Sequence, residues 1–231
     1  MRNEMERSSY YQEHCSVHMD RASQENDDIK SQPIAHQFNP YEANGGSVIA
    51  VAGDNFVAVG CETRLCNDNE IVTRNQQKMF QITPKIIFAT TGNACDGDEL
   101  AEVLKTGANT YLMEHNREIS VNSLMQELSN TMYMKRMFPY VVYPLLCGLQ
   151  DGKGHIYSFD VIGHPILDNQ IDCSSMEEKL EIPMTIQRAV DLITDGLVSA
   201  AERCTLTGDS MVISIITENG VEKRDMELRK D

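Results

Sequence analysis

Residues 45–64 constrain the fold of this chain more than any other stretch of its sequence. They hold two apolar runs on either side of the turn sequence Gly53-Asp54-Asn55. Such runs around a turn predict a hairpin, with strands at about 47–52 and 56–61. Both strands are apolar on both faces, which indicates that other layers cover the hairpin on each side. The second strand ends on an acid and a base, in Glu62-Thr63-Arg64.

The composition excludes several classes of function. With 231 residues, of which 41% are hydrophobic, the chain can bury a substantial core. Its net charge of −15 argues against nucleic acid as a partner and against an anionic membrane surface. The sequence shows no apolar run of membrane-spanning length and no signal peptide. Seven cysteines without a Cys-x-x-Cys pair indicate free thiols, so we expect a reducing location, the cytoplasm and nucleus.

The first part of the sequence differs from the rest. Residues 1–44 are rich in Ser, Gln, Asn, Asp and Glu, which predicts a polar N-terminal extension or propeptide-like arm before a domain at 45–231. Phe38-Asn39-Pro40-Tyr41 in this arm could dock on a surface. A metal at His14-Cys15-Ser16-Val17-His18 is the less favoured interpretation, because the segment has no core to hold ligand geometry. We expect no metal and no cofactor.

Strand and helix signals alternate through the rest of the chain. Further strands are expected at about 71–73, 78–82, 85–90, 140–149, 155–160, 211–217 and 221–228. Apolar residues at helical spacing predict a helix capped by Asp98, a second helix from Val121 that Pro139 stops, and a third over about 185–203. The order of strands, two helices, strands, helix and strands predicts an α+β fold with two antiparallel sheets and helices outside each.

A series of short motifs resembles the beta subunits of the proteasome, which belong to the N-terminal nucleophile hydrolase superfamily. The motifs are 138–143, 148–154, 157–160, 167–170, 199–203, Thr207-Gly208-Asp209 and Leu228-Arg229-Lys230-Asp231. Together they are most similar to the non-catalytic subunit at the sixth ring position, and the resemblance covers roughly residues 37–231. It implies a four-layer αββα sandwich and a place in two inner beta rings between two outer alpha rings.

The resemblance also implies partner subunits and a function for the chain. A subunit of this kind is an obligate hetero-oligomer that contacts neighbouring beta subunits, alpha-ring subunits and the opposite beta ring. Its work is assembly within ATP- and ubiquitin-linked protein degradation. By the resemblance, the neighbour at the fifth ring position carries the chymotrypsin-like activity, and we expect the turn that contains Gln150 and Asp151 to form part of the wall of its substrate pocket.

Active members of the superfamily supply a chemistry to test against this sequence. The first residue of their processed chain attacks the peptide carbonyl, and its α-amino group serves as the base. A lysine lies sixteen residues after the acid of the acid-x-Arg element, and here Lys78 follows Glu62 at that spacing. The nucleophile lies sixteen residues before the acid, where this chain has Gly46. Gly92 falls where active members donate the oxyanion N–H. The resemblance therefore implies a vestigial site without a catalytic residue.

An active peptidase that uses Ser47 is the alternative. Ser47 is one residue out of register, and such a shift turns a strand side chain to the opposite face. Without a catalytic role, Lys78 and Glu62 are expected to remain as a buried ion pair that helps to hold the hairpins in place. Active members support the amine with Asp and Ser, where this chain has Cys204 and Thr207. A cysteine nucleophile is disfavoured as well, because no His base lies at a recognisable spacing.

The sequence departs from the family pattern after Phe159-Asp160. Only Val161-Ile162-Gly163-His164-Pro165-Ile166 stands before Leu167, where the family carries a longer segment and the start of a helix. The resemblance therefore does not extend to the third family helix or to the contacts of that region with the opposite ring.

Overall fold

The computed structural model describes residues 44–67, 70–168, 171–173 and 184–230. All of these described residues belong to one compact unit. The segment 14–18, where a metal is the less favoured interpretation, and the possible docking segment at 38–41 lie outside the described residues. The placement of the domain boundary between 44 and 45 stays a prediction.

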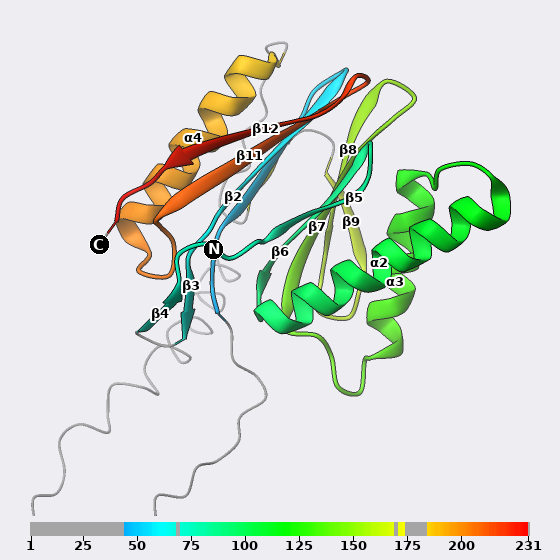
Figure 1. Cartoon of the computed structure of the whole chain (residues 1–231), viewed down its shortest axis with the longest axis horizontal. Coiled ribbons are helices and arrows are strands. Elements are labelled where there is room, and N and C mark those ends of the chain that lie inside the picture. The colour runs from blue at the N-terminus through cyan, green and yellow to red at the C-terminus, as the bar shows by residue number, and fades with distance from the viewer. Residues whose placement is uncertain (1–43, 68–69, 169–170, 174–183, 231) are drawn as a thin grey trace, which may run out of the picture. The chain divides into compact units, whose positions relative to one another are not determined.

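The opening hairpin lies in the middle of the first sheet (Figure 1). The strand order is β10-β1-β2-β11-β12, and every pair is antiparallel. The strands are β1 (Val48–Ala52), β2 (Phe56–Glu62), β10 (Ile171–Cys173), β11 (Ser210–Thr217) and β12 (Gly220–Glu227). All seven residues of β2 are buried. The predicted hairpin is therefore confirmed, and it is covered on both faces as its composition indicates.

The second sheet is built from consecutive antiparallel strands in the order β5-β6-β7-β8-β9. Its strands are β5 (Met79–Thr83), β6 (Ile86–Gly92), β7 (Val142–Gln150), β8 (Lys153–Phe159) and β9 (Pro165–Asp168). A separate two-stranded ribbon, β3 (Leu65–Asn67) with β4 (Glu70–Thr73), leads from the first sheet toward β5.

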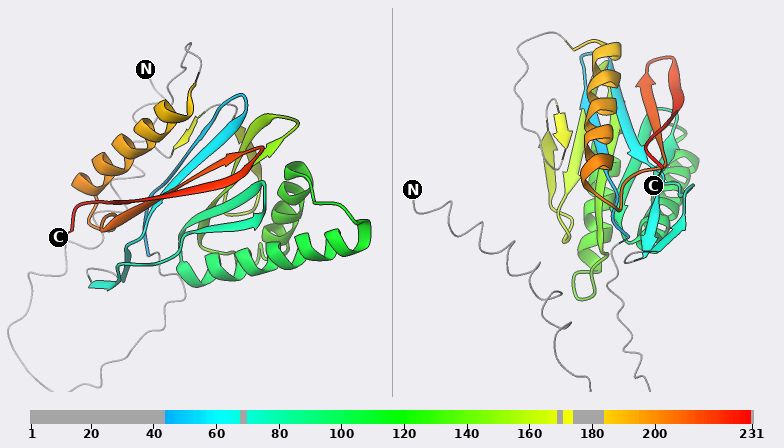
Figure 2. Two further views of the ribbon diagram at one scale, coloured as in Figure 1. Left: turned by 45° about the horizontal axis from the view of Figure 1, so that its top comes forward. Right: turned by 90° about the vertical axis from the view of Figure 1, so that its left-hand side faces the viewer.

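The helices cover the outer faces of the two sheets (Figure 2). Helices α2 (Ala94–His115) and α3 (Val121–Met134) pack on the second sheet, and α4 (Ile186–Arg203) packs on the first. Three apolar clusters fill the spaces between layers. One lies between α2, α3 and the second sheet, one between the two sheets, and one between the first sheet and α4. The expected αββα sandwich is confirmed.

Two predicted helix boundaries are wrong. Helix α2 is capped by Asn93, whose Oδ1 accepts from the backbone N–H of Asp96 at 3.1 Å, and not by Asp98. The first turn is small and polar, so the apolar stripe that begins at Leu100 starts too late to reveal it. Helix α3 ends at Met134, five residues before Pro139, so this proline does not stop it.

The shortened segment forms a tight turn between β8 and β9. Asp160 Oδ1 accepts from the backbone N–H groups of Ile162 at 3.0 Å and His164 at 2.7 Å. Gly163 has φ of 89°, and a Cβ there would lie 2.7 Å from the Cβ of Met132, so glycine is required. Residues 160–168 therefore contain a turn and a strand, and the third family helix does not begin in them.

Candidate functional site

The four residues of the predicted vestigial site lie at the same end of the two sheets. Gly46 stands just before β1, and Glu62 is the last residue of β2. Lys78 stands just before β5, and Gly92 is the last residue of β6. The backbone N–H of Glu62 donates to the carbonyl of Ser47 at 3.4 Å, which closes the first hairpin beside Gly46.

Gly46, Glu62 and Lys78 meet directly. A Cβ built on Gly46 would lie 2.6 Å from Lys78 Nζ and 2.7 Å from Glu62 Oε1. Gly46 itself has φ of 112°, a conformation that residues with a Cβ rarely adopt. The space that a nucleophilic side chain at this position would need is therefore occupied by the lysine and the glutamate.

Lys78 and Glu62 form the predicted buried ion pair through Nζ and Oε1. The exposed fraction is 6% for the Lys78 side chain and 0% for Glu62. Backbone N–H groups also bind the carboxylate, from Ser47 at 3.2 Å and from Arg64 at 2.6 Å. Burial raises the pKa of Glu62 above its ordinary value, and this outweighs the lowering by Lys78 and the two N–H groups.

The hydroxyl of Ser47 is directed elsewhere. Its Oγ lies 2.9 Å from Oγ1 of Thr207, which is buried in the loop after α4. Only the backbone N–H of Ser47 reaches Glu62. Cys204, in the other position that the resemblance implies, is exposed at the end of α4.

Gly92 carries a hydrogen bond that sequence reasoning did not anticipate. Its backbone N–H, which falls at the position of the oxyanion donor in active members, donates to the carbonyl of Gly45 at 3.4 Å. In return the backbone N–H of Asn44 donates to the carbonyl of Gly92 at 3.0 Å. The chain's own junction with its N-terminal arm thus lies along the end of β6.

A second buried charge cluster adjoins the first through Arg64. The Asp209 carboxylate binds Arg64 Nε at 2.8 Å and also pairs with the half-exposed Arg74. Burial alone would raise the pKa of Asp209, but its bonds to the two guanidinium groups hold that pKa below the ordinary value. Asp209 entered the sequence analysis only as part of a motif, and no local pattern indicated its two partners.

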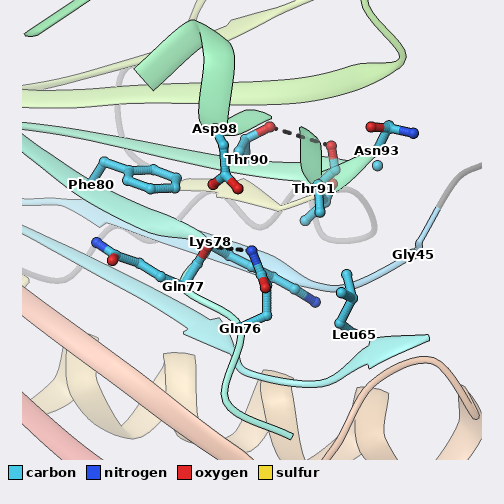
Figure 3. A pocket seen from close by; sticks show the side chains of 12 residues that line it. Gly45, Leu65, Gln76, Gln77, Lys78, Phe80, Thr90, Thr91, Asn93 and Asp98 are labelled. Atoms are coloured by element: carbon cyan, nitrogen blue, oxygen red, sulfur yellow. Dashed lines mark hydrogen bonds between the residues drawn. The ribbon is translucent and has the colours of Figure 1, made fainter. Parts of the chain in front are cut away.

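A small pocket opens beside Lys78, between β5, β6 and the start of α2 (Figure 3). Its lining consists of Gly45, Leu65, Gln76, Gln77, Lys78, Phe80, Thr90, Thr91, Gly92, Asn93, Ala94 and Asp98. The room inside is about enough for one water molecule. The pocket as it stands therefore does not admit a substrate side chain.

Two further features bear on the chemistry of the chain. Within residues 44–67, 70–168, 171–173 and 184–230, no group of three or more His, Cys, Asp or Glu side chains is placed to hold a metal ion. In the same part of the chain, no helix is long and apolar enough to cross a membrane.

Comparisons with known proteins agree with the fold. Residues 42–216 match the family model described as proteasome subunit. The chain is 39% identical over 214 residues to proteasome subunit beta type-1 of Drosophila melanogaster, which covers 84% of this chain and 91% of that protein. It is 34% identical over 237 aligned residues to proteasome subunit beta type-6 of Saccharomyces cerevisiae. This alignment covers 91% of this chain and 98% of that protein. The chain therefore belongs to the proteasome subunit family.

Proposed function

We propose that this chain is a non-catalytic, structural subunit of the beta ring of the 20S proteasome core. In this proposal it supports assembly through contacts with neighbouring beta subunits, alpha-ring subunits and the opposite beta ring. It acts within ATP- and ubiquitin-linked protein degradation in the cytoplasm and nucleus. Its relatives named beta type-1 and beta type-6 align over nearly their whole length, which supports this assignment.

The observation that carries the non-catalytic part is the environment of Gly46. The residue has no side chain to attack a carbonyl, and Lys78 and Glu62 occupy the space in front of it. The nearest hydroxyl, that of Ser47, is paired with Thr207 and lies away from the acid and the lysine. An N-terminal nucleophile uses its own α-amino group as the base, whereas in the uncleaved chain the nitrogen of Ser47 is a backbone amide that donates to Glu62 and cannot take a proton.

The surface supports a role in assembly. Several large apolar side chains are more than half exposed: Val72, Met113, Tyr133, Met134, Met137, Phe138, Tyr143 and Ile162. Tyr133, Met134, Met137 and Phe138 follow one another closely at the end of α3. Contiguous exposed apolar residues of this size are typical of surfaces that partner chains cover.

The turn between β7 and β8 lies at the other end of the sheets from Gly46. Asp151 has φ of 53°, and Oε1 of Gln150 is buried without a hydrogen-bond partner among the described residues. Asp151 itself is exposed, so it is open to contact with another chain. This exposure supports the hypothesis that Gln150 and Asp151 face a neighbouring subunit and form part of its substrate pocket.

The mature N-terminus tests the non-catalytic proposal. We expect intact-mass measurement of the chain from purified particles to exclude Ser47 as the first residue. A covalent probe that captures N-terminal nucleophiles should label active subunits and leave this chain unlabelled. A mature chain that begins at Ser47 and takes up the probe would establish the alternative, an active peptidase.

Cleavage kinetics test the contribution to the neighbouring site. Gln150→Ala removes the buried amide, and Asp151→Asn removes the charge while keeping a residue that tolerates a positive φ. We expect either change to alter cleavage after large apolar residues in the assembled particle. Asn219→Ala, in the exposed β11–β12 turn, serves as the control. If neither variant changes the cleavage of any chymotrypsin-like substrate relative to this control, the hypothesis that Gln150 and Asp151 form part of the neighbouring pocket is wrong.

A further inference from the structure

Asn44 binds three separate parts of the body at once. Its side-chain Nδ2 donates to the carbonyl of Cys66 in β3 at 2.9 Å. Its Oδ1 accepts from the backbone N–H of Ala94, the first residue of α2, at 3.0 Å. Its backbone N–H donates to Gly92 at the end of β6. This one residue thus ties the start of the body to the ribbon and to a helix N-terminus through its side chain, and to the second sheet through its backbone.

The bonds to Gly92 have the pattern of strand pairing. Gly92 accepts from the N–H of Asn44 at 3.0 Å and donates to the carbonyl of Gly45 at 3.4 Å. An extended peptide that approached the end of β6 would need these same two groups, because main-chain N–H and C=O groups give such peptides their affinity. Residues 44–45 therefore satisfy in cis the groups with which a separate peptide would pair.

The path from Asn44 to Ser47 is fixed by more than these bonds. Gly45 has φ of 71°, and a Cβ there would lie 2.6 Å from Cδ1 of Leu206. Gly46 has φ of 112° and lies against the Lys78–Glu62 pair. Gly45 and Gly46 thus both have positive φ and no room for a side chain, which restricts the backbone to one conformation where it passes the site. Asn44 is the only side chain at this junction that bonds to the body on both sides of that path within the described residues.

We propose that Asn44 is a positioning residue that clamps residues 44–46 as an intramolecular occupant of the peptide position along Gly92. The clamp keeps Gly92 N–H bonded within the chain, closes the end of β6 to other extended segments, and protects the junction with the arm from proteolysis. This inference rests on the proposed non-catalytic function, since an active subunit needs Gly92 free for the oxyanion.

Hydrogen exchange of the Gly92 amide in the assembled particle tests the clamp. Asn44→Ala removes both side-chain bonds, and we expect the Gly92 amide to exchange about tenfold faster or more, as the loss of one or two hydrogen bonds predicts. Asn44→Asp keeps the acceptor for Ala94 but loses the donor to Cys66. The exchange rate of the Gly92 amide in this variant should therefore lie between those of wild type and Asn44→Ala. Asn219→Ala at the far end of the sheets is the matched control and should exchange like wild type.

Two readouts separate the clamp from the proposed function. The covalent nucleophile probe should leave this chain unlabelled in every variant, and a non-specific protease should cut Asn44→Ala faster between residues 44 and 47. Unchanged exchange and cutting in both Asn44 variants would overturn the clamp and leave the non-catalytic function standing. Equal acceleration in Asn219→Ala would also overturn it. Labelling of the wild-type chain would instead overturn the proposed function.

Discussion

Glu62 and Asp209 are both buried carboxylates at the same end of the sandwich, and they are held in different ways. Glu62 has one cationic partner, Lys78, and two backbone N–H donors. Asp209 has two guanidinium partners, Arg64 and Arg74. Burial dominates at Glu62 and raises its pKa, whereas the two guanidinium groups dominate at Asp209 and lower its pKa.

The difference separates a structural cluster from the pair that, under the proposed function, is a vestigial site. Asp209 links the end of β2 to the segment before β5 through the two arginines. Its backbone also binds the C-terminal tail, by N–H donation to the carbonyl of Arg229 at 3.0 Å and acceptance from Leu228 at 3.0 Å. The Glu62 pair links fewer segments, and its other side faces Gly46. The Asp209 cluster therefore holds several segments of the fold together, and under the proposed function the Glu62–Lys78 pair keeps the geometry of a site that lacks its nucleophile.

Removing the charge of Asp209 should have the largest effect on stability. Asp209→Asn removes the carboxylate that the buried Arg64 side chain (2% exposed) binds, and an arginine cannot release its proton to compensate. Because Asn tolerates the φ of 70° at this position, the change reports on charge and not on backbone strain. We expect a loss of about 3–5 kcal/mol in the free energy of unfolding, measured by pulse proteolysis in urea.

Asp225→Asn is the matched control for this change. Asp225 lies exposed on β12 in the same sheet, so its substitution should stay within about 0.5 kcal/mol of wild type. If Asp209→Asn were equally mild, the Asp209 cluster would not be the structural member of the comparison.

Removing Lys78 should cost less than removing the charge of Asp209. Lys78→Met leaves Glu62 without its cation, but burial already favours the protonated carboxyl, so Glu62 can become neutral. We expect a loss of about 2–3 kcal/mol at neutral pH that shrinks as the pH falls toward the pKa of Glu62. The same urea titration measures it, with the exposed Lys223→Met as control. A loss as large as that of Asp209→Asn at every pH would show that the two clusters do not differ in kind.

A side chain at Gly46 should have a smaller effect that depends on Lys78. Gly46→Ala places a Cβ against Lys78 Nζ and forces a residue with a Cβ to a φ of 112°, so we expect a loss of about 1–2 kcal/mol. In the Lys78→Met background part of this cost should disappear, because the clashing ammonium is gone. Strict additivity of the two losses would mean that Lys78 does not fill the space. Gly46→Thr should remain unlabelled by the nucleophile probe.

Most of the fold could be predicted from the sequence because its signals are local. The hairpin at 45–64 and the stripe from Ile186 to Ala200 are apolar patterns with clear periods, and the structure has the strands and the helix where these patterns predict them. The start of α2 was missed because its first turn carries little apolar signal, and its cap is set by the end of β6. The strand β9 could not be predicted because it depends on pairing with β8 rather than on its own four residues.

The site divides in the same way. The relation between Glu62 and Lys78 could be predicted because the family's site residues lie at fixed spacings along the sequence. The structure brings the two side chains together as an ion pair. The partners of Asp209 lie 145 and 135 residues away in the chain, so only the folded structure could join them. Asn44 was assigned to the polar arm, because nothing in its sequence neighbourhood shows three partners distributed over β3, β6 and α2.

The smallest effect is also the most specific one, a pH dependence of opposite sign at the two carboxylates. The pKa of Asp209 is lowered from its ordinary value of 3.8, so its contribution is fully present above 3.8 and is lost as the pH falls through the folded-state pKa. The pKa of Glu62 is raised from 4.5, so its contribution is fully present below 4.5 and is lost as the pH rises through the folded-state pKa. Pulse proteolysis with pepsin in urea at acid pH measures the contributions of both carboxylates to the free energy of unfolding.

As the pH falls, the stability difference between wild type and Asp209→Asn should therefore shrink below about pH 4, whereas the difference between wild type and Glu62→Gln should shift in favour of wild type toward about pH 4.5. Each unit of pKa displacement corresponds to about 1.4 kcal/mol of this change. Two differences that move in the same direction with pH would mean that both carboxylates are governed by the same balance of burial and pairing. Differences of opposite sign would separate the carboxylate whose pKa two arginines lower from the one whose pKa burial raises.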